Sequence, residues 1–430
     1  MRQAIQFLAS TCLVFAALTT VASAAQPLPQ PLRVASWNLG WHISKAELPQ
    51  WLAQCGKTYQ KDAADGVWKL AATGTVGWLI DESRAKVQGI DLSVMPPCGV
   101  FEADRQKLIV TPKSWAQRDW QIGEVIGKSI APDVIAFQEV SGTQAVIEAL
   151  GDYASQYRVC SFDGKYKVQR LAFAWKKELG EPIEACTAID AISLPHLPLE
   201  QQVRPGFQMG LRVNGQLIRF LTLHLKAGCV SPLDRGKLDV NTGPNDPCPV
   251  LQQQVAPLEA AFEKLGAGGA SFVVIGDFNR NLWHELHEVA GAKAVRSDGN
   301  TDLTQPLPAN VLTQNLYKEI NDGMPATSKA TLLELSCPGD AATQALCARS
   351  KTEAVPRREL AALGTKEALG CRNAVALDQV MVSDDLKTKV LESRKVSIGA
   401  FGRSTAPTDA LPEPVLAFSD HCPSLVTLGL

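Results

Sequence analysis

The chain has 430 residues, of which 46% are hydrophobic and 20% are charged, and its formal net charge is −2. This composition is typical of a globular protein with a sizeable core. The balanced charge gives no support to a protein that binds nucleic acid through a large overall positive charge, although a local basic patch remains compatible with it.

Residues 1–24 have the features of an export signal. Arg2 supplies the positive end, an apolar stretch follows, and Ala22-Ser23-Ala24 is a small-residue cleavage site. No later run approaches the ~20 apolar residues that a transmembrane helix needs. We expect cleavage after Ala24 and a periplasmic or extracellular protein; a lipoprotein attached through Cys12 is the alternative.

Disulfides are expected throughout the exported chain. Eleven cysteines are present, and Cys12 leaves with the signal. The ten others have no Cys-x-x-Cys pair among them, and an oxidising compartment favours their pairing. Metal binding by thiolates is therefore disfavoured.

A first strand is expected at residues 33–40, and an insertion follows it at about 42–118. Far more residues separate Asn38 from Glu139 than two neighbouring strands and a helix require. The insertion contains four tryptophans with Cys55 and Cys98, and it lacks a clear strand pattern. It is expected to be a compact, partly helical, disulfide-tied lobe. Either it stabilises one edge of the domain, or it is a lid or substrate platform with exposed tryptophans.

The remaining elements alternate between helices and strands. Asn214-Gly215 between apolar runs predicts a hairpin, and Pro257 within an amphipathic helix implies a kink or a late start. A second insertion is expected at about 297–371. In chain order we expect a helix at 120–130, a strand at 133–140, a helix at 143–150, strands at 170–176 and 207–225, a helix at 250–265 and a buried strand at 272–276. This order indicates one α/β catalytic domain over residues 25–430 with mixed sheets.

Polar side chains stand at or near the ends of six apolar runs. These groups are Asn38, Glu139, His224, Asp277 with Asn279, Asp378, and Asp420 with His421. In this order the runs resemble the endonuclease/exonuclease/phosphatase superfamily with the DNase-I-like fold. The resemblance implies a four-layered sandwich of two mixed β-sheets flanked by helices, with the active site at one end.

The resemblance also implies a divalent metal site. Asn38 and Glu139 would offer an amide oxygen and a carboxylate, and Asp420 would be a second ligand or an orienting group. Oxygen donors suit Mg²⁺, with Ca²⁺ or Mn²⁺ as alternatives. Glu139 as the merely exposed end of its strand is the other interpretation.

Carried over to this chain, the family pattern gives catalytic roles to five residues. His421 would assist the attacking water and Asp378 would orient its imidazole. Asp277 would take part in water activation or metal binding, Asn279 would hold the phosphate, and His224 would contact the phosphate or the leaving group. His224 shares a strand face with Thr222, opposite to the neighbouring leucines, so a simple core histidine is disfavoured.

The loop after His224 is expected to stay near the site. A loop of this length would be mobile unless tied, so a Cys229–Cys248 disulfide is predicted. Substrate contacts are expected from Lys226, from Arg235 and Lys237 in the tied loop, and from Arg170. For Arg170, Arg235 and Lys237, solvated charges are the alternative.

These features predict an exported, divalent-metal-dependent phosphodiesterase that acts as a monomer. A nuclease that hydrolyses DNA or RNA is the leading hypothesis. Hydrolysis of a phospholipid, either sphingomyelin or a phosphoinositide, is the second, and a non-catalytic binding protein on the same fold is the third. The complete set of polar groups disfavours the third hypothesis.

Overall fold

The computed structural model describes residues 30–82, 86–164, 168–199, 201–231, 247–287, 293–295, 301–306, 315–353 and 355–430. The expected export signal and the expected substrate contacts Arg235 and Lys237 lie outside these ranges. Within them, no helix has the length and apolar character needed to cross a membrane.

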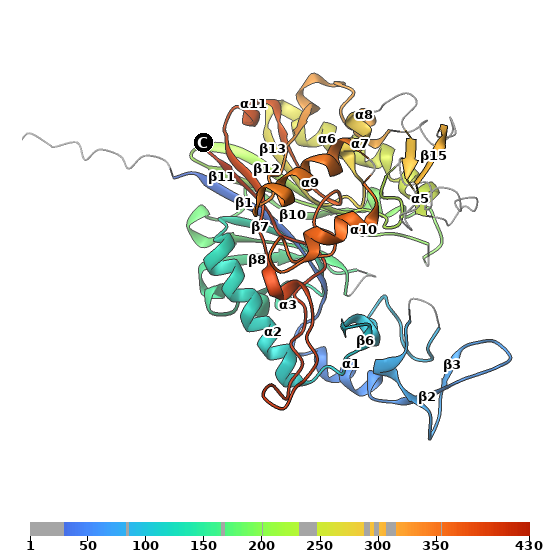
Figure 1. Cartoon of the computed structure of the whole chain (residues 1–430). Coiled ribbons are helices and arrows are strands. Elements are labelled where there is room, and N and C mark those ends of the chain that lie inside the picture. Colours follow the sequence, from blue (N-terminus) through green and yellow to red (C-terminus); the bar gives the residue numbers. More distant parts are fainter. Residues whose placement is uncertain are drawn as a thin grey trace, which may run out of the picture.

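Two six-stranded mixed sheets form the centre of the molecule (Figure 1). The first has the order β18 (Val390–Lys395), β19 (Ser424–Leu428), β1 (Leu32–His42), β7 (Val134–Val140), β9 (Arg170–Lys176), β8 (Tyr157–Ser161). The second has the order β10 (Glu184–Ile189), β11 (Gly206–Val213), β12 (Gln216–His224), β13 (Ser271–Asp277), β17 (Asp378–Ser383), β16 (Ala330–Leu332). The pairs β1–β7 and β12–β13 are parallel, whereas the other neighbours are antiparallel.

Alternation along the strands gives each sheet an inner and an outer apolar face. On β1, Val34 packs between the sheets, whereas Ala35 and Trp37 pack toward helices. The helical layer over the first sheet comprises α2 (Pro112–Glu124), its continuation Val125–Ile130 and α3 (Thr143–Ala149). Helix α6 (Val255–Gly266) covers the second sheet. The expected four-layered sandwich is confirmed.

The helix expected at 250–265 is divided in two. Helix α5 (Pro247–Gln253) ends before Gln254, and α6 begins at Val255. Pro257 lies in the first turn of α6, where its missing N–H has no intrahelical partner to lose. Of the two alternatives for Pro257, the late start is therefore the one adopted.

A lobe follows β1 and projects from the sandwich (Figure 1). The lobe contains short strands that leave no clear pattern in the sequence, because runs of two to four residues are too short to show a period. Cys55 and Cys98 form the expected disulfide. Trp51, Trp78 and Trp115 are buried in the lobe core, so they are not the exposed stacking platform considered above. The elements of the lobe are α1 (Leu48–Cys55), β2 (Thr58–Lys61), β3 (Trp68–Leu70), β4 (Thr75–Val76), β5 (Glu102–Ala103) and β6 (Gln106–Lys107).

The remaining elements lie after β13. They are α7 (Leu282–Leu286), β14 (Lys293–Val295), β15 (Thr301–Pro306), α8 (Leu316–Glu319), α9 (Ala341–Thr352), α10 (Arg357–Leu360) and α11 (Asp384–Lys387). All ten cysteines after Cys12 pair as disulfides. Besides Cys55–Cys98, the pairs are Cys160–Cys186, Cys229–Cys248, Cys337–Cys347 and Cys371–Cys422. The predicted Cys229–Cys248 bridge is thus confirmed.

Removal of the Cys229–Cys248 bridge by a double serine substitution should lower the free energy of unfolding by about 3 kcal/mol, because the unfolded chain regains the entropy of an open loop. Denaturant titration of purified protein measures the loss. A double serine substitution at Cys337 and Cys347 is the matched control. Its bridge closes a loop with a sequence separation of 10 against 19, so its loss should be about 0.5 kcal/mol smaller. An unchanged free energy of unfolding would contradict the assigned role of the bridge.

Candidate active site

Three polar side chains line up at one end of the second sheet. His224 on β12 lies opposite Asp277 on β13, and Asp277 lies opposite Asp378 on β17. Residues that are directly opposite on neighbouring strands present their side chains to the same face. The expected grouping of these three residues therefore follows from strand register.

Glu139 reaches the same end of the sandwich from the first sheet. Strict alternation would place its side chain with Phe137, toward the helices. The pairing of β7 becomes irregular between Phe137 and Val140, and Glu139 has a φ of 56°, in the left-handed region. This irregularity turns the carboxylate toward His224. Asn279, after β13, also has a left-handed backbone, with a φ of 51°.

Asn38 joins the two sheets at this end. Its Nδ2 donates to Asp277 Oδ2 at 3.1 Å and lies 3.3 Å from Glu139 Oε1, while its Oδ1 accepts from the N–H of Gly40 at 3.0 Å. Glu139 Oε2 also accepts from the N–H of Trp41 at 3.2 Å. The amide nitrogen of Asn38, and not its oxygen, therefore faces the two carboxylates. In this arrangement Asn38 orients them.

His421 lies between two aspartates. Its Nδ1 is 3.1 Å from each carboxylate oxygen of Asp378, and its Nε2 is 3.7 Å from Asp277 Oδ2. The buried Nζ of Lys395 lies 3.1 Å from Asp378 Oδ2. Asp378 thus has two cationic partners, and it fixes the orientation of the imidazole.

The charges around His421 favour its protonated form. Burial lowers its pKa, but the carboxylates of Asp378, Asp277 and Asp420 outweigh burial and raise the pKa to about 10. Burial is the main reason that the pKa of Asp277 rises to about 7. A protonated imidazole donates a proton and cannot accept one. The expected base role of His421 therefore needs a lower pKa, which the charge of a nearby divalent cation would favour.

His224 is buried between Glu139 and Asp277. Its Nε2 lies 3.5 Å from Glu139 Oε1 and 3.6 Å from Asp277 Oδ2. Burial and the charge of Arg204 hold its pKa well below the usual value, so the ring is neutral. The neighbouring leucines of β12 pack against α6, which confirms the expected orientation of the strand.

The residues present fit a hard divalent cation. Burial and the charge of Asp420 raise the pKa of Glu139, so this part of the site carries unbalanced negative charge. Carboxylate oxygens are the donors that Mg²⁺ prefers. Ligand atoms of Asp277, Asp378 and His421 also lie within 4.8 Å of one another. Lys395 already balances Asp378, however, so a cation would neutralise more unbalanced charge beside Glu139 and Asp420.

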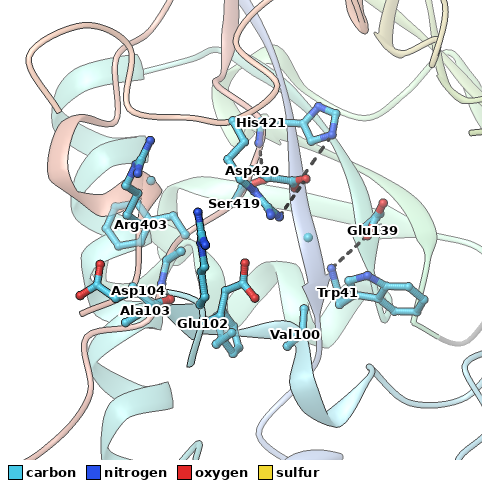
Figure 2. A pocket seen from close by; sticks show the side chains of 18 residues that line it. Trp41, Val100, Glu102, Ala103, Asp104, Glu139, Arg403, Ser419, Asp420 and His421 are labelled. Carbon is cyan, nitrogen blue, oxygen red and sulfur yellow. Dashed lines mark hydrogen bonds and ion pairs between the residues drawn. The ribbon is translucent and has the colours of Figure 1, made fainter. Parts of the chain in front are cut away.

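A pocket of about 490 Å³ opens in front of these groups. Glu139, Asp420 and His421 line one side of it. The other side comes from the lobe, where Figure 2 shows Glu102 and Asp104 facing the segment that carries Asp420. The lobe, whose role the sequence left open, therefore forms a wall of the candidate active site.

Three further polar residues support the site, and sequence reasoning did not find them. Lys395 pairs with Asp378, Asn373 donates through Nδ2 to Asp420 Oδ2 at 2.8 Å, and Arg204 donates to the backbone oxygen of His224 at 3.1 Å. Each is a single polar residue in an ordinary stretch of sequence. No local pattern distinguishes it from a solvated charge or amide.

The other expected contacts lie at different distances from the pocket. Asn279 is buried beside Asp277, and its Nδ2 donates to the backbone oxygen of Leu225 at 3.1 Å. Lys226 is half-buried next to His224, and burial lowers its pKa. Arg170 does not join the group, because it lines a separate pocket of about 360 Å³ and donates to the backbone oxygen of Ser141 at 3.1 Å.

Arg118 on α2 is a buried cation that holds two parts of the site together. Its Nε donates to the backbone oxygen of Ala417 at 2.9 Å. Its Nη2 donates to the backbone oxygens of Leu39, at 2.8 Å, and of Phe418. Leu39 follows Asn38 in the chain, and Phe418 precedes the Ser-Asp-His segment. Arg118 therefore ties β1 to that segment.

Asp119 lies beside this cation and is buried without a hydrogen-bond partner among the described residues. His42 Nε2 lies 3.9 Å from Asp119 Oδ1, but burial holds the pKa of His42 well below its usual value, so this ring is neutral. Burial, opposed by the charge of Arg118, raises the pKa of Asp119 to about 7. The unfolded chain releases this proton near pH 4. The folded state therefore loses stability as the pH rises from about 4 to about 7.

Asp119→Asn should remove that loss, because asparagine does not ionise. We expect the variant to gain up to about 4 kcal/mol over wild type at pH 8 and much less at pH 4. Urea unfolding at both pH values measures the difference. The exposed Asp409→Asn serves as the control and should show no such pH dependence. An equal effect of Asp119→Asn at both pH values would contradict the assignment.

Several solved structures are similar to this chain at low identity. An endonuclease/exonuclease/phosphatase family protein of Bacteroides thetaiotaomicron is 12% identical, with 93% of this chain and 98% of that chain covered and a TM-score of 0.42. A mannosyl-6-phosphatase of the same species is also 12% identical, with coverages of 92% and 98% and a TM-score of 0.42. The human Nocturnin catalytic domain is 13% identical, with coverages of 93% and 94% and a TM-score of 0.39.

No curated protein matches the chain. A family model does match, and the matched range begins at Asp104 in the lobe, contains Glu139 and ends at His421. It is the model of the Endonuclease/Exonuclease/phosphatase family, and it covers residues 104–421. Because this range is most of the chain and contains most of the polar cluster, the protein belongs to the Endonuclease/Exonuclease/phosphatase family.

Proposed function

We propose that this protein is an exported, divalent-metal-dependent phosphodiesterase that hydrolyses nucleic acid. Enzymes of its family are metal-dependent phosphoesterases. The observation that carries the proposal is the meeting of Glu139, Asp277 and His421 beside one pocket, with His224 behind them. Such a set supplies carboxylates for a cation and imidazoles for a phosphate.

In this proposal His421 and Asp378 act as one unit. Asp378 holds the imidazole through Nδ1, and Nε2 faces Asp277 and the pocket. Asp277 and His421 together position and deprotonate the attacking water. A divalent cation at Glu139 and Asp420 would neutralise phosphate charge and favour the leaving oxygen. The neutral ring of His224 would donate a hydrogen bond to the phosphate, and Asn279 would help to hold it.

We also propose that the protein is exported to an oxidising compartment. Five disulfides, including one that adjoins His421, are typical of proteins outside the cytoplasm. Together with the signal-like residues 1–24, they support export to the periplasm or the medium. A monomer remains our expectation.

Incubation of purified residues 25–430 with single-stranded DNA, RNA, sphingomyelin and a phosphoinositide tests the substrate. Each reaction contains Mg²⁺, Ca²⁺, Mn²⁺ or chelator. We expect metal-dependent cleavage of nucleic acid. Hydrolysis of a lipid alone would show that a lipid, and not nucleic acid, is the substrate. If no substrate is hydrolysed with any metal, a non-catalytic binding protein is favoured.

A further inference from the structure

The lobe presents a strained hairpin tip to the candidate active site. Strands β5 and β6 are joined by two residues, Asp104 and Arg105, whose φ values are 49° and 68°. A two-residue turn with both residues in the left-handed region normally contains Asn, Asp or Gly. Asp104 is of these types but Arg105 is not, so Arg105 carries strain of about 1–2 kcal/mol. Such strain is typical of functional positions, and both residues line the pocket.

The base of the hairpin is firmly held, so the position of its tip is defined. Phe101 and Leu108 are buried in the lobe core, and the N–H of Leu108 donates to the backbone oxygen of Phe101 at 3.0 Å. The guanidinium of Arg118 lies 5.6 Å from the centre of the Phe101 ring. The cation that ties β1 to the Ser-Asp-His segment therefore also contacts the hairpin base.

The pocket contains two arginines without an acidic partner. Glu102 pairs with Lys107 at 3.3 Å, and Arg372 pairs with Asp420 at 3.5 Å. Arg105 and Arg403 line the same pocket, and neither has a carboxylate within ion-pair distance among the described residues. Arg403 is held from behind, since its Nε donates to the backbone oxygen of Gly364 at 3.1 Å. Figure 2 shows Arg403 on the side of the pocket away from Glu139.

A second anionic group fits this arrangement. Guanidinium groups bind phosphate oxygens with two parallel hydrogen bonds. Glu139 and His421 define where a scissile phosphate would lie, and Arg105 and Arg403, which have no carboxylate partner among the described residues, line another part of the pocket. A volume near 490 Å³ is within the range of about 300–1,000 Å³ that holds small molecules. A pocket of this size therefore suits a flexible single strand of nucleic acid more than a duplex or a bilayer surface.

We propose that Arg105 and Arg403 bind a second phosphate of the substrate, next to the one that is cleaved, so that the preferred substrate is a single-stranded nucleotide chain. This inference rests on the proposed function and names the substrate class of the same site. Arg105 is then a specificity-determining residue, supplied by the lobe. Asp104, one position earlier on the same tip, opposes the binding of the second phosphate by its negative charge.

Calorimetric titration with two nucleotides tests the inference without turnover. Thymidine 3′,5′-bisphosphate and thymidine 5′-monophosphate differ by one phosphate. We expect wild type, with Mg²⁺ present, to bind the bisphosphate at least tenfold more tightly. Arg105→Asn should reduce this preference to below threefold, and Arg403→Gln should reduce it as well. Asp104→Asn should increase it.

The chain offers matched controls for this experiment. Asparagine is well tolerated at left-handed positions, so Arg105→Asn and Asp104→Asn both retain the turn while they change charge in opposite directions. Arg212, on β11, pairs with Leu217 near the start of β12, far from His224 at the end of that strand. Arg212→Asn should therefore leave the preference unchanged. Equal affinity of wild type for the two nucleotides, or an unchanged preference in Arg105→Asn, would overturn the inference.

Hydrolysis is measured separately, so that the two proposals can fail independently. The substrates are the 5′-p-nitrophenyl ester of thymidine 5′-monophosphate with and without a 3′-phosphate, and glycerophosphoinositol with and without a 4-phosphate. The ratio of kcat/KM should favour the 3′-phosphate, and Arg105→Asn should lower that ratio at least fivefold. A preference that occurs only in the inositol pair would refute the nucleotide chain. Retained binding preference without any hydrolysis would refute the proposed function alone.

Discussion

His421→Ala should lower turnover by roughly 10²–10⁴, which is the usual contribution of a positioned acid or base. Its imidazole is the group that links Asp378 to the pocket, with Nδ1 3.1 Å from both oxygens of that carboxylate. Asp378→Asn should act in the same direction, because it removes the acceptor that fixes the ring. Initial rates at saturating substrate measure both effects. The far-ultraviolet circular dichroism of each variant should match wild type.

The double variant gives the sharper result. If Asp378 and His421 act as one unit, the loss in the double variant should be close to that of His421→Ala alone. If the loss of turnover in the double variant equals the product of the two single losses, the pairing is refuted. The exposed His196→Ala is the matched control and should retain wild-type turnover. Thermal unfolding of each variant must be measured alongside the rates. Asp378→Asn leaves the buried Lys395 with a neutral partner, which lowers stability.

Removal of the divalent cation should abolish activity, and Glu139→Gln should reproduce that loss in the presence of metal. The carboxylate of Glu139, whose side chain is 14% exposed, is the proposed ligand at the position where negative charge is unbalanced. Glutamine retains its shape and removes the charge. Activity with excess chelator and titration with Mg²⁺ measure the two effects. Full turnover of Glu139→Gln under excess chelator would refute the metal assignment.

Stability provides a second test of Glu139 that does not depend on catalysis. Binding of Mg²⁺ at 100 times its dissociation constant should stabilise wild type by about 2.7 kcal/mol. Glu139→Gln should lose this gain, yet it should be more stable than wild type without metal, since it no longer buries an unbalanced charge. Glu178→Gln is the control. Glu178 is exposed and lies just after β9, beside the start of β7 and far from Glu139 near the end of that strand.

The central strands and their polar ends could be predicted from the sequence. Apolar, β-branched runs such as the one before Asp277 are buried on both faces, and this burial leaves a clear local pattern. The direction of Glu139 could not be predicted in the same way. It depends on a backbone irregularity in β7, and a strict period of two places the side chain on the wrong face.

The lobe shows a different limit of sequence reasoning. Its strands have two to four residues, and their pairing depends on contacts within the lobe that leave no period in the chain. Tryptophans that looked available for stacking instead form its core. Arg105 shows the same limit, because it shares a pocket with Asp420 only when the lobe packs beside the sandwich. Such a relation has no signature at either position in the sequence.

The left-handed backbone at Glu139 and Asn279 has a consequence for engineering. Asparagine tolerates such a conformation, whereas glutamate pays about 1–2 kcal/mol for it, and glycine would adopt it freely. A library selected for heat resistance alone would therefore accept glycine at residue 139 and would discard the carboxylate of the proposed metal site. Any programme that seeks a more stable form of this protein must hold that position fixed and look for its gains elsewhere.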